Sequence, residues 1–192
     1  MSLRDRLNNE LKQAMREKNT AKRDVIRSIT AAIKEAEQEK REKLTKAALA
    51  KHNVTAPGGQ GDADAMAAYG DAVDEAVAAE NVDEKATLTD EEILEVIQRM
   101  IKRQRDALQE AEEAGRDDIV QEAQAEINLL SEFLPRQLTR EEIEAEARAV
   151  IDEVGAEGPR DIGKVMGPLT NKLKGQAEGR VISEVVKDLL SE

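Results

Sequence analysis

The sequence contains no cysteine among its 192 residues. A chain without thiols forms no disulfide, no thiolate zinc site and no cysteine nucleophile, and this composition fits a reducing compartment. Histidine is nearly absent as well: His52 is the only one, in a segment poor in large apolar residues, so we expect it to be neither catalytic nor a metal ligand. We expect no metal and no cofactor.

Aromatic residues are also scarce, at 1% of the chain. Strands favour β-branched and aromatic side chains in alternation, so few strands can be built from this composition. Charged residues reach 36%, and the apolar residues are mainly Leu, Ile, Val, Met and Ala. These are the residues of long amphipathic helices, and the sequence therefore predicts an all-α fold.

Long hydrophobic runs are missing too. No stretch approaches the roughly 20 apolar residues that cross a bilayer. The N-terminal stretch "MSLRDRLNNELK" is amphipathic and charged, unlike a signal peptide. We expect a soluble cytoplasmic protein without membrane contact.

Cap residues mark the first helices. Ser2 can cap a helix on which Leu3, Leu7, Leu11 and Met15, spaced four apart, predict one apolar stripe. Asn19 and Thr20 indicate a turn and a second helix that ends at about Leu44.

Residues 45–87 differ from the rest in charge and composition. They carry three Lys/Arg against eight Asp/Glu and have few large apolar side chains. Pro57-Gly58-Gly59 predicts a mobile loop over 57–61, followed by a weak helix over 62–80. We interpret 45–87 as an acidic, partly flexible insertion.

Two further capping boxes mark helix starts in residues 88–192. Thr89 begins a long helix over 90–114, and Gly115 separates it from a helix that Pro135 ends; the short turn predicts an antiparallel hairpin. Thr139 begins a three-helix group over 139–192. The sequence thus predicts an N-terminal helical domain, 1–138, and a C-terminal three-helix domain, 139–192.

One basic stretch stands out in a chain of net charge −12. "GKVMGPLTNKLKGQAEGR" carries four Lys/Arg against Glu178 alone. Cations beside glycines and a helix N-terminus suit a phosphate backbone, although surface lysines around a helix joint explain the pattern equally from the residues alone. The candidate RNA contacts are Arg160, Gly163, Lys164, Lys172, Lys174, Gly175, Gly179 and Arg180, and a second basic face comprises Arg16, Lys22, Arg23 and Arg27.

These C-terminal motifs resemble a known family. "GKVM" and "KLKGQAEGRVISEVVKDLL" are similar to the end of the YqeY family, and so are "LNNELKQAMREKNTAKRDVIRSITAAIKEAEQEKR", "LTDEEILEVIQRMIKRQRDALQEAEEAGRDD" and "EINLLSEFLPRQLTREEI". The family shares its C-terminal part with the tail of the B subunit of the aspartyl/glutamyl-tRNA amidotransferase. The resemblance implies two all-α domains and a surface that holds tRNA. Residues 45–87 depart from the family pattern as we interpret it.

Catalytic motifs are not apparent. No P-loop and no serine in a nucleophile loop is present, and the acidic runs are typical of helix starts and solvated faces. The first hypothesis is a tRNA-binding accessory protein that is non-catalytic alone. This hypothesis requires that neighbouring acidic side chains do not cover the cations of the basic stretch. The alternative is a helical protein–protein adaptor, with an amidotransferase or other translation proteins as partners. An amidase or carbon–nitrogen ligase with glutamine as amido donor is the third hypothesis.

Overall fold

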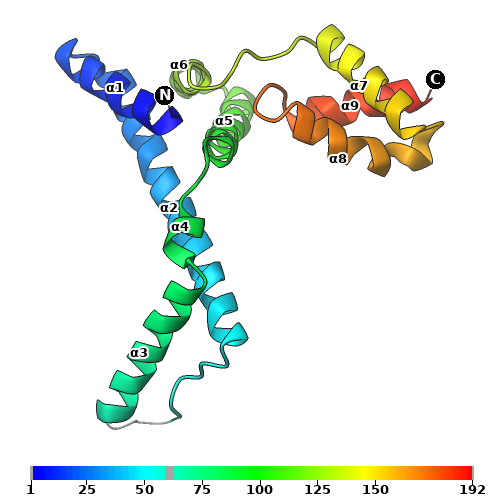
Figure 1. Ribbon diagram of the computed structural model, residues 1–192. Helices are drawn as coiled ribbons and strands as arrows, with labels where there is room; N and C mark the ends of the chain where they lie inside the picture. Colours follow the sequence, from blue (N-terminus) through cyan, green and yellow to red (C-terminus); the bar gives the residue numbers. More distant parts are fainter. Residues whose placement is uncertain (1, 59–62, 192) are drawn as a thin grey trace. The chain divides into compact units, whose positions relative to one another are not determined.

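The computed structural model describes residues 2–58 and 63–191, and within them every regular element is helical (Figure 1). The all-α prediction is confirmed. The chain divides into two compact units, residues 1–96 and 97–192, and each is described by itself.

The first two helices begin at the predicted caps. In α1 (Leu3–Arg16) the Ser2 hydroxyl accepts from the backbone N–H of Asp5, and the Asp5 carboxylate accepts from the backbone N–H of Ser2. In α2 (Thr20–Lys51) the Asn19 side-chain oxygen accepts from the backbone N–H of Lys22 at 3.0 Å. Each cap satisfies one N–H that has no partner inside its helix.

The predicted apolar stripe of α1 is wrong at Met15. Leu7 and Ala14 are buried, whereas Met15 is 56% exposed. A spacing of four residues turns 400° on a helix, so the stripe drifts by about 40° at each step. By the third step Met15 has left the buried face, and Ala14 takes its place.

The second helix is longer than predicted. It continues without interruption to Lys51 instead of ending at about Leu44, because Thr45 to Lys51 include six alanine, leucine and lysine residues that favour helix and no glycine or proline. Helix α3 (Ala63–Ala79) confirms the helix predicted over 62–80, and a short α4 (Val82–Ala86) follows. Most of the loop predicted over 57–61 lies outside the described residues.

Helices α3 and α4 pack along α2, as Figure 1 shows. Ion pairs join the pieces: Arg41 Nε lies 2.6 Å from Asp83 Oδ1, and Lys51 Nζ lies 2.7 Å from Glu80 Oε1. Residues 45–87 therefore fold back on the helix from which they continue.

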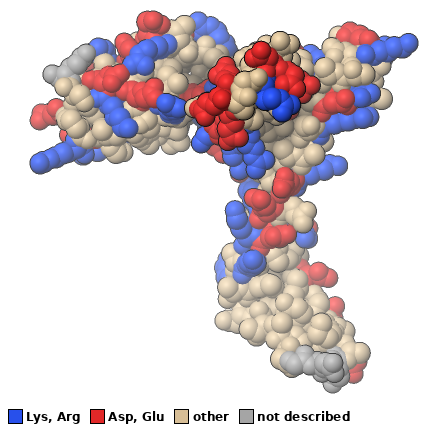
Figure 2. All heavy atoms as spheres, turned by 180° about the vertical axis from the view of Figure 1, so that it is seen from behind, with Lys and Arg blue, Asp and Glu red and all other residues tan. Residues whose placement is uncertain are grey.

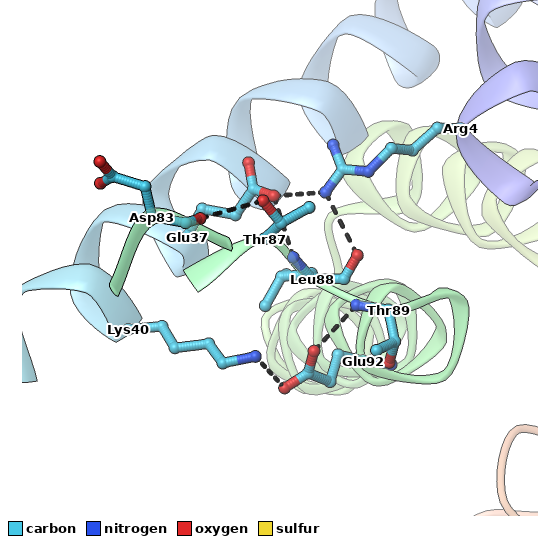
Figure 3. Close-up of polar contacts among 8 residues, drawn as sticks. All are labelled: Arg4, Glu37, Lys40, Asp83, Thr87, Leu88, Thr89 and Glu92. Atoms are coloured by element: carbon cyan, nitrogen blue, oxygen red, sulfur yellow. Dashed lines mark hydrogen bonds and ion pairs between the residues drawn. The ribbon is translucent and has the colours of Figure 1, made fainter. Parts of the chain in front are cut away.

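A polar junction joins α1, α2 and the segment before α5 (Figure 3). Glu37 of α2 accepts from the Arg4 guanidinium and, at 3.0 Å, from the backbone N–H of Leu88. Lys40 Nζ lies 2.6 Å from Glu92 Oε1, and the other Glu92 oxygen accepts from the backbone N–H of Thr89. Glu37 and Glu92 thus each bind a cation and a backbone donor.

Helices α5 (Asp90–Glu113) and α6 (Asp117–Ser131) follow the predicted boundaries closely. Thr89 and Glu92 form the predicted capping box. Gly115 adopts φ +66°, a left-handed conformation that glycine reaches without a Cβ clash. Gln104 of α5 donates to Glu126 of α6 at 2.8 Å.

The C-terminal group comprises α7 (Arg140–Val154), the 3₁₀ turn Pro159–Asp161, α8 (Ile162–Lys172) and α9 (Gly179–Ser191). Its three α-helices pack on one another around a hydrophobic core of its own. The core residues are Ile143, Ala147, Val150, Val165, Leu169, Leu173, Ala177, Ile182, Val185, Val186 and Leu190. Thr139, where we placed the domain boundary, is the N-cap of α7, and the compact unit that contains the group begins at Ile97, so the boundary at 138/139 stays a prediction.

The start of α7 gives a pH-dependent prediction. The Arg136 guanidinium, together with the backbone N–H of Thr139, lowers the pKa of Glu142. A carboxylate with a lowered folded pKa stabilises the fold fully above its unfolded pKa of about 4.3 and loses that contribution as the pH falls through the folded value. The melting temperature of wild type should therefore exceed that of Glu142→Gln at about pH 7, and the difference should shrink as the pH falls below about 4.3.

Melting temperatures followed by circular dichroism across this range test the prediction. Arg136→Gln is the matched control, since it removes the main cause of the shift and should flatten the same pH dependence. A difference between wild type and Glu142→Gln that stays constant with pH would contradict it.

Candidate nucleic-acid interface

The predicted RNA-contact residues all lie in the α7–α9 group. Arg160 is in the 3₁₀ turn, Gly163, Lys164 and Lys172 are in α8, and Gly179 and Arg180 begin α9. Lys174 and Gly175 lie in the turn between α8 and α9, where Gly175 adopts φ +78°. The fold thus gathers these residues on two consecutive helices and their connection.

Lys164 is paired on its own helix. Its Nζ lies 2.6 Å from Oδ1 of Asp161, three residues earlier. Asp161 raises the pKa of Lys164, and Lys164, followed by the backbone N–H of Glu157, lowers the pKa of Asp161. Both groups therefore stay charged at neutral pH.

Lys172 and Arg180 are paired as well. Lys172 Nζ lies 2.7 Å from Oε2 of Glu146 on α7, which raises the pKa of Lys172. Arg180 Nε lies 2.9 Å from Oε1 of Glu184, one turn along α9. Lys174 also has an interaction partner, whereas the described part of the chain shows no hydrogen bond or ion pair for Arg160.

We expected these cations not to be paired with neighbouring acidic side chains, and this expectation is wrong. Lys164, Lys172 and Arg180 each have a carboxylate within 3 Å, and on the face shown in Figure 2 basic and acidic side chains of this group are intermixed. The cations remain solvent-exposed at 63%, 50% and 87% of their side chains. RNA contact at these positions stays a prediction, and it now requires exchange of carboxylates for phosphates.

The glycines leave space on this surface. A Cβ added at Gly163 or Gly179 would meet no atom within 4 Å, so packing does not require glycine at either position. Gly175 differs, because its positive φ is the left-handed conformation that side chains disfavour. Gly163 and Gly179 allow a bulky ligand to approach the backbone, and Gly175 shapes the turn.

The second basic face lies at the α1–α2 turn. Lys22 Nζ is 2.8 Å from Glu10 Oε2, and Arg23 binds Asp24 through two hydrogen bonds of 2.8 Å. The exposed side chains of Arg16 and Arg27 make no hydrogen bond or close ion pair within the described residues, although Arg23 and, to a smaller extent, the charge of Arg27 lower the pKa of Asp24. Two of the four predicted cations are therefore without a close partner there.

Sequence reasoning missed Lys18 at this turn. Lys18 adopts φ +58° and, with Arg23 and Arg27, lines a hollow of about 270 Å³ beside the exposed Met15. The signal was present in the sequence, because Lys18 directly precedes the Asn19 cap, where a left-handed residue often ends the preceding helix.

His52 contacts a carboxylate that directly follows α3. His52 follows α2, and its Nε2 lies 3.1 Å from Glu80 Oε1. Over 2–58 and 63–191, no group of three acidic or histidine side chains is placed to hold a metal ion. Over the same ranges, no helix has the length and apolar character to cross a membrane.

Comparison with family models identifies one match. The model described as "Yqey-like protein" matches residues 4–55 and 61–190. The chain belongs to the YqeY family. A search of curated protein sequences gave no match.

The YqeY match includes most of residues 45–87. The family model matches 45–55 and 61–87 and leaves out 56–60, so the interpretation of 45–87 as an insertion stays a prediction. Helix α2 continues through residue 45, so no structural break separates the segment from the preceding helix.

Proposed function

We propose that this YqeY protein is a tRNA-binding accessory protein without catalysis of its own, related to the tail of the amidotransferase. The observation that carries the proposal is the set of exposed cations around the α8–α9 turn, beside glycines whose missing side chains leave the backbone accessible. Cations and exposed backbone N–H groups position phosphates without reading bases. Such a surface suits the RNA backbone.

The ion pairs at this surface are weak enough to exchange. Exposed pairs of this kind contribute about 0–1 kcal/mol each, because water and salt screen them. Phosphate oxygens make charge-assisted hydrogen bonds of at least similar strength with the same cations. We therefore expect weak binding of tRNA, with Asp161, Glu146 and Glu184 acting as competitors.

Removal of the competing carboxylates gives the sharpest test. In Glu146→Gln/Asp161→Asn/Glu184→Gln the three cations lose their partners but keep their charge, so affinity for tRNA should rise roughly three- to thirtyfold. The three substitutions also raise the net charge of the chain by three. The matched control, Asp64→Asn/Asp71→Asn/Glu75→Gln, makes the same net change on exposed positions of α3.

Fluorescence titrations with bulk tRNA at several salt concentrations measure these affinities. For the triple variant, log K should fall against log salt with a slope of about −3 to −4, and Lys164/Lys172/Lys174/Arg180→Ala should abolish most of this dependence. Equal gains in the triple variant and its control would assign the effect to net charge and contradict the site. No binding at low salt by any variant would remove the proposal.

The pairing of the cations favours a second candidate function, a helical protein–protein adaptor. If the carboxylates hold the cations in solution, the α7–α9 surface presents alternating charges, which suits another protein better than RNA. An amidotransferase or another translation protein is the partner class that the YqeY resemblance suggests. Co-elution of purified amidotransferase with this protein after nuclease treatment would support the adaptor, and separate elution would count against that partner.

A further inference from the structure

The α1–α2 turn carries a hollow that the proposed tRNA surface does not use. Seven residues line it, of which three are cations and none is a carboxylate. All seven belong to the N-terminal unit, so the hollow is complete within residues 1–96. In a chain of net charge −12, a concave surface without acids is a local exception.

Met15 gives this hollow an apolar side. Its neighbour Ala14 is buried and belongs to the packed face of α1, while Met15 points away from that face and is one of the large apolar side chains that remain exposed. Methionine is unbranched and polarizable, so it adapts to apolar partners of different shapes. An apolar contact beside several cations is complementary to a helix with an apolar face and acidic flanks.

Lys18 and Arg27 supply the uncommitted charge. Within the described residues neither side chain makes a hydrogen bond or a close ion pair, whereas Arg23 makes two hydrogen bonds to Asp24; Arg27 acts on Asp24 only through the charge attraction that helps to lower the pKa of Asp24. The positive φ of Lys18 places it outside α1 and α2, at the edge of the hollow. A ligand with two acidic groups therefore finds two cationic side chains that need not first break a hydrogen bond or a close ion pair.

We propose that this hollow docks an acidic amphipathic helix of another protein. An apolar side chain of that helix packs on Met15, and carboxylates on its flanks pair with Lys18 and Arg27. Charge complementarity favours an acidic partner, and the apolar contact favours a protein over RNA, because no aromatic side chain lines the hollow to stack on a base. The tRNA proposal is independent of this surface.

Methyl NMR reports on this site directly. The sequence has five methionines, so a protein labelled with ¹³C at the methionine methyl groups gives few signals, and Met15→Leu assigns the one from Met15. The probe is a synthetic acidic peptide of about five helical turns, with leucines on one face and glutamates elsewhere. A peptide with the same composition in scrambled order, which lacks the apolar face, is the peptide control.

Variants test the charges without disturbing the packed faces. Lys18→Asn/Arg27→Glu removes the uncommitted cations, and asparagine tolerates the left-handed conformation at position 18. Lys43→Gln/Lys46→Glu makes the same change in charge at exposed positions farther along α2. The first variant should bind the peptide about tenfold more weakly or worse, and the second should bind as wild type does.

Each result decides the proposal. A shift of the Met15 signal with the amphipathic peptide, lost in Lys18→Asn/Arg27→Glu and retained in the control variant, supports it. No shift, or equal shifts with the scrambled peptide, overturns it. A shift of the Met15 signal with bulk tRNA but not with peptide would assign the hollow to RNA. A dimer that forms through this face without peptide would assign it to a second copy of the chain. Either result overturns the proposal.

Discussion

Leu169→Ala is expected to lower the free energy of unfolding of the α7–α9 group by about 2–5 kcal/mol. Leu169 is fully buried at the centre of the core that α7, α8 and α9 share. Truncation removes three carbons from contact with the surrounding side chains and leaves a cavity that the helices close only in part. A core this small has few other contacts that compensate, so we expect the largest effect of any single substitution considered.

Chemical denaturation of the full chain, followed by circular dichroism and by the methionine methyl signal of Met166, measures this loss. Met166 lies next to the same core and reports on it locally. The control is Thr170→Ala, an exposed neighbour on α8, which should change stability by less than about 0.5 kcal/mol. A Leu169→Ala loss no larger than that of Thr170→Ala would mean that the three helices do not pack as described.

Glu37→Ala is expected to lower the free energy of unfolding of the N-terminal unit by about 2–3 kcal/mol. The Glu37 carboxylate accepts from the Arg4 guanidinium and from the backbone N–H of Leu88, a buried residue (Figure 3). Alanine leaves that N–H without its acceptor and releases α1 from α2 at this point. The cost is therefore the desolvation of a buried donor added to the loss of a charged hydrogen bond.

Glu37→Gln separates the two contributions to this loss of stability, the lost acceptor for Leu88 and the lost charge beside Arg4. Glutamine keeps an oxygen for the Leu88 N–H but lacks the charge that binds Arg4, so it should cost less than alanine. Glu39→Ala, an exposed position two residues along α2, serves as the control and should lie within about 0.5 kcal/mol of wild type. Equal stability of Glu37→Ala and Glu39→Ala in thermal and denaturant unfolding would contradict the described junction.

Helix starts were predictable because their physics is local. Ser2, Asn19, Thr89 and Thr139 each accept from a backbone N–H three residues ahead, and a sequence of four residues contains the whole motif. The left-handed glycine at 115 is equally local, since a chain that ends a helix and turns sharply needs a positive φ.

Helix ends and burial were less predictable. The end of α2 depends on residues 45–51, whose intrinsic preference is helical but whose low content of large apolar residues indicated a change of structure. The exposure of Met15 follows from the pitch of an α-helix, which a count of residues four apart approximates only over short distances. The sequence pattern identified helices better than it identified which of their faces pack.

The candidate site illustrates the same difference. Asp161 with Lys164 and Arg180 with Glu184 are spaced three and four apart, so both pairs could have been predicted from helical geometry. Glu146 with Lys172 could not, because the two residues meet only when α7 packs on α8. The predicted cations lie together on α8, α9 and their connection, but their pairing with carboxylates was not predicted.

Helix α2 runs for 32 residues without a proline or glycine, a rod of about 48 Å. Its N-terminal end borders the hollow of the α1–α2 turn, and its C-terminal end bears Lys51, which pairs with Glu80. Helix α3 packs along the far part of α2, so one continuous helix connects the hollow at the α1–α2 turn with α3. Within the described residues of this unit, α2 contacts α1, α3 and α4 and is therefore the scaffold on which these three helices are assembled.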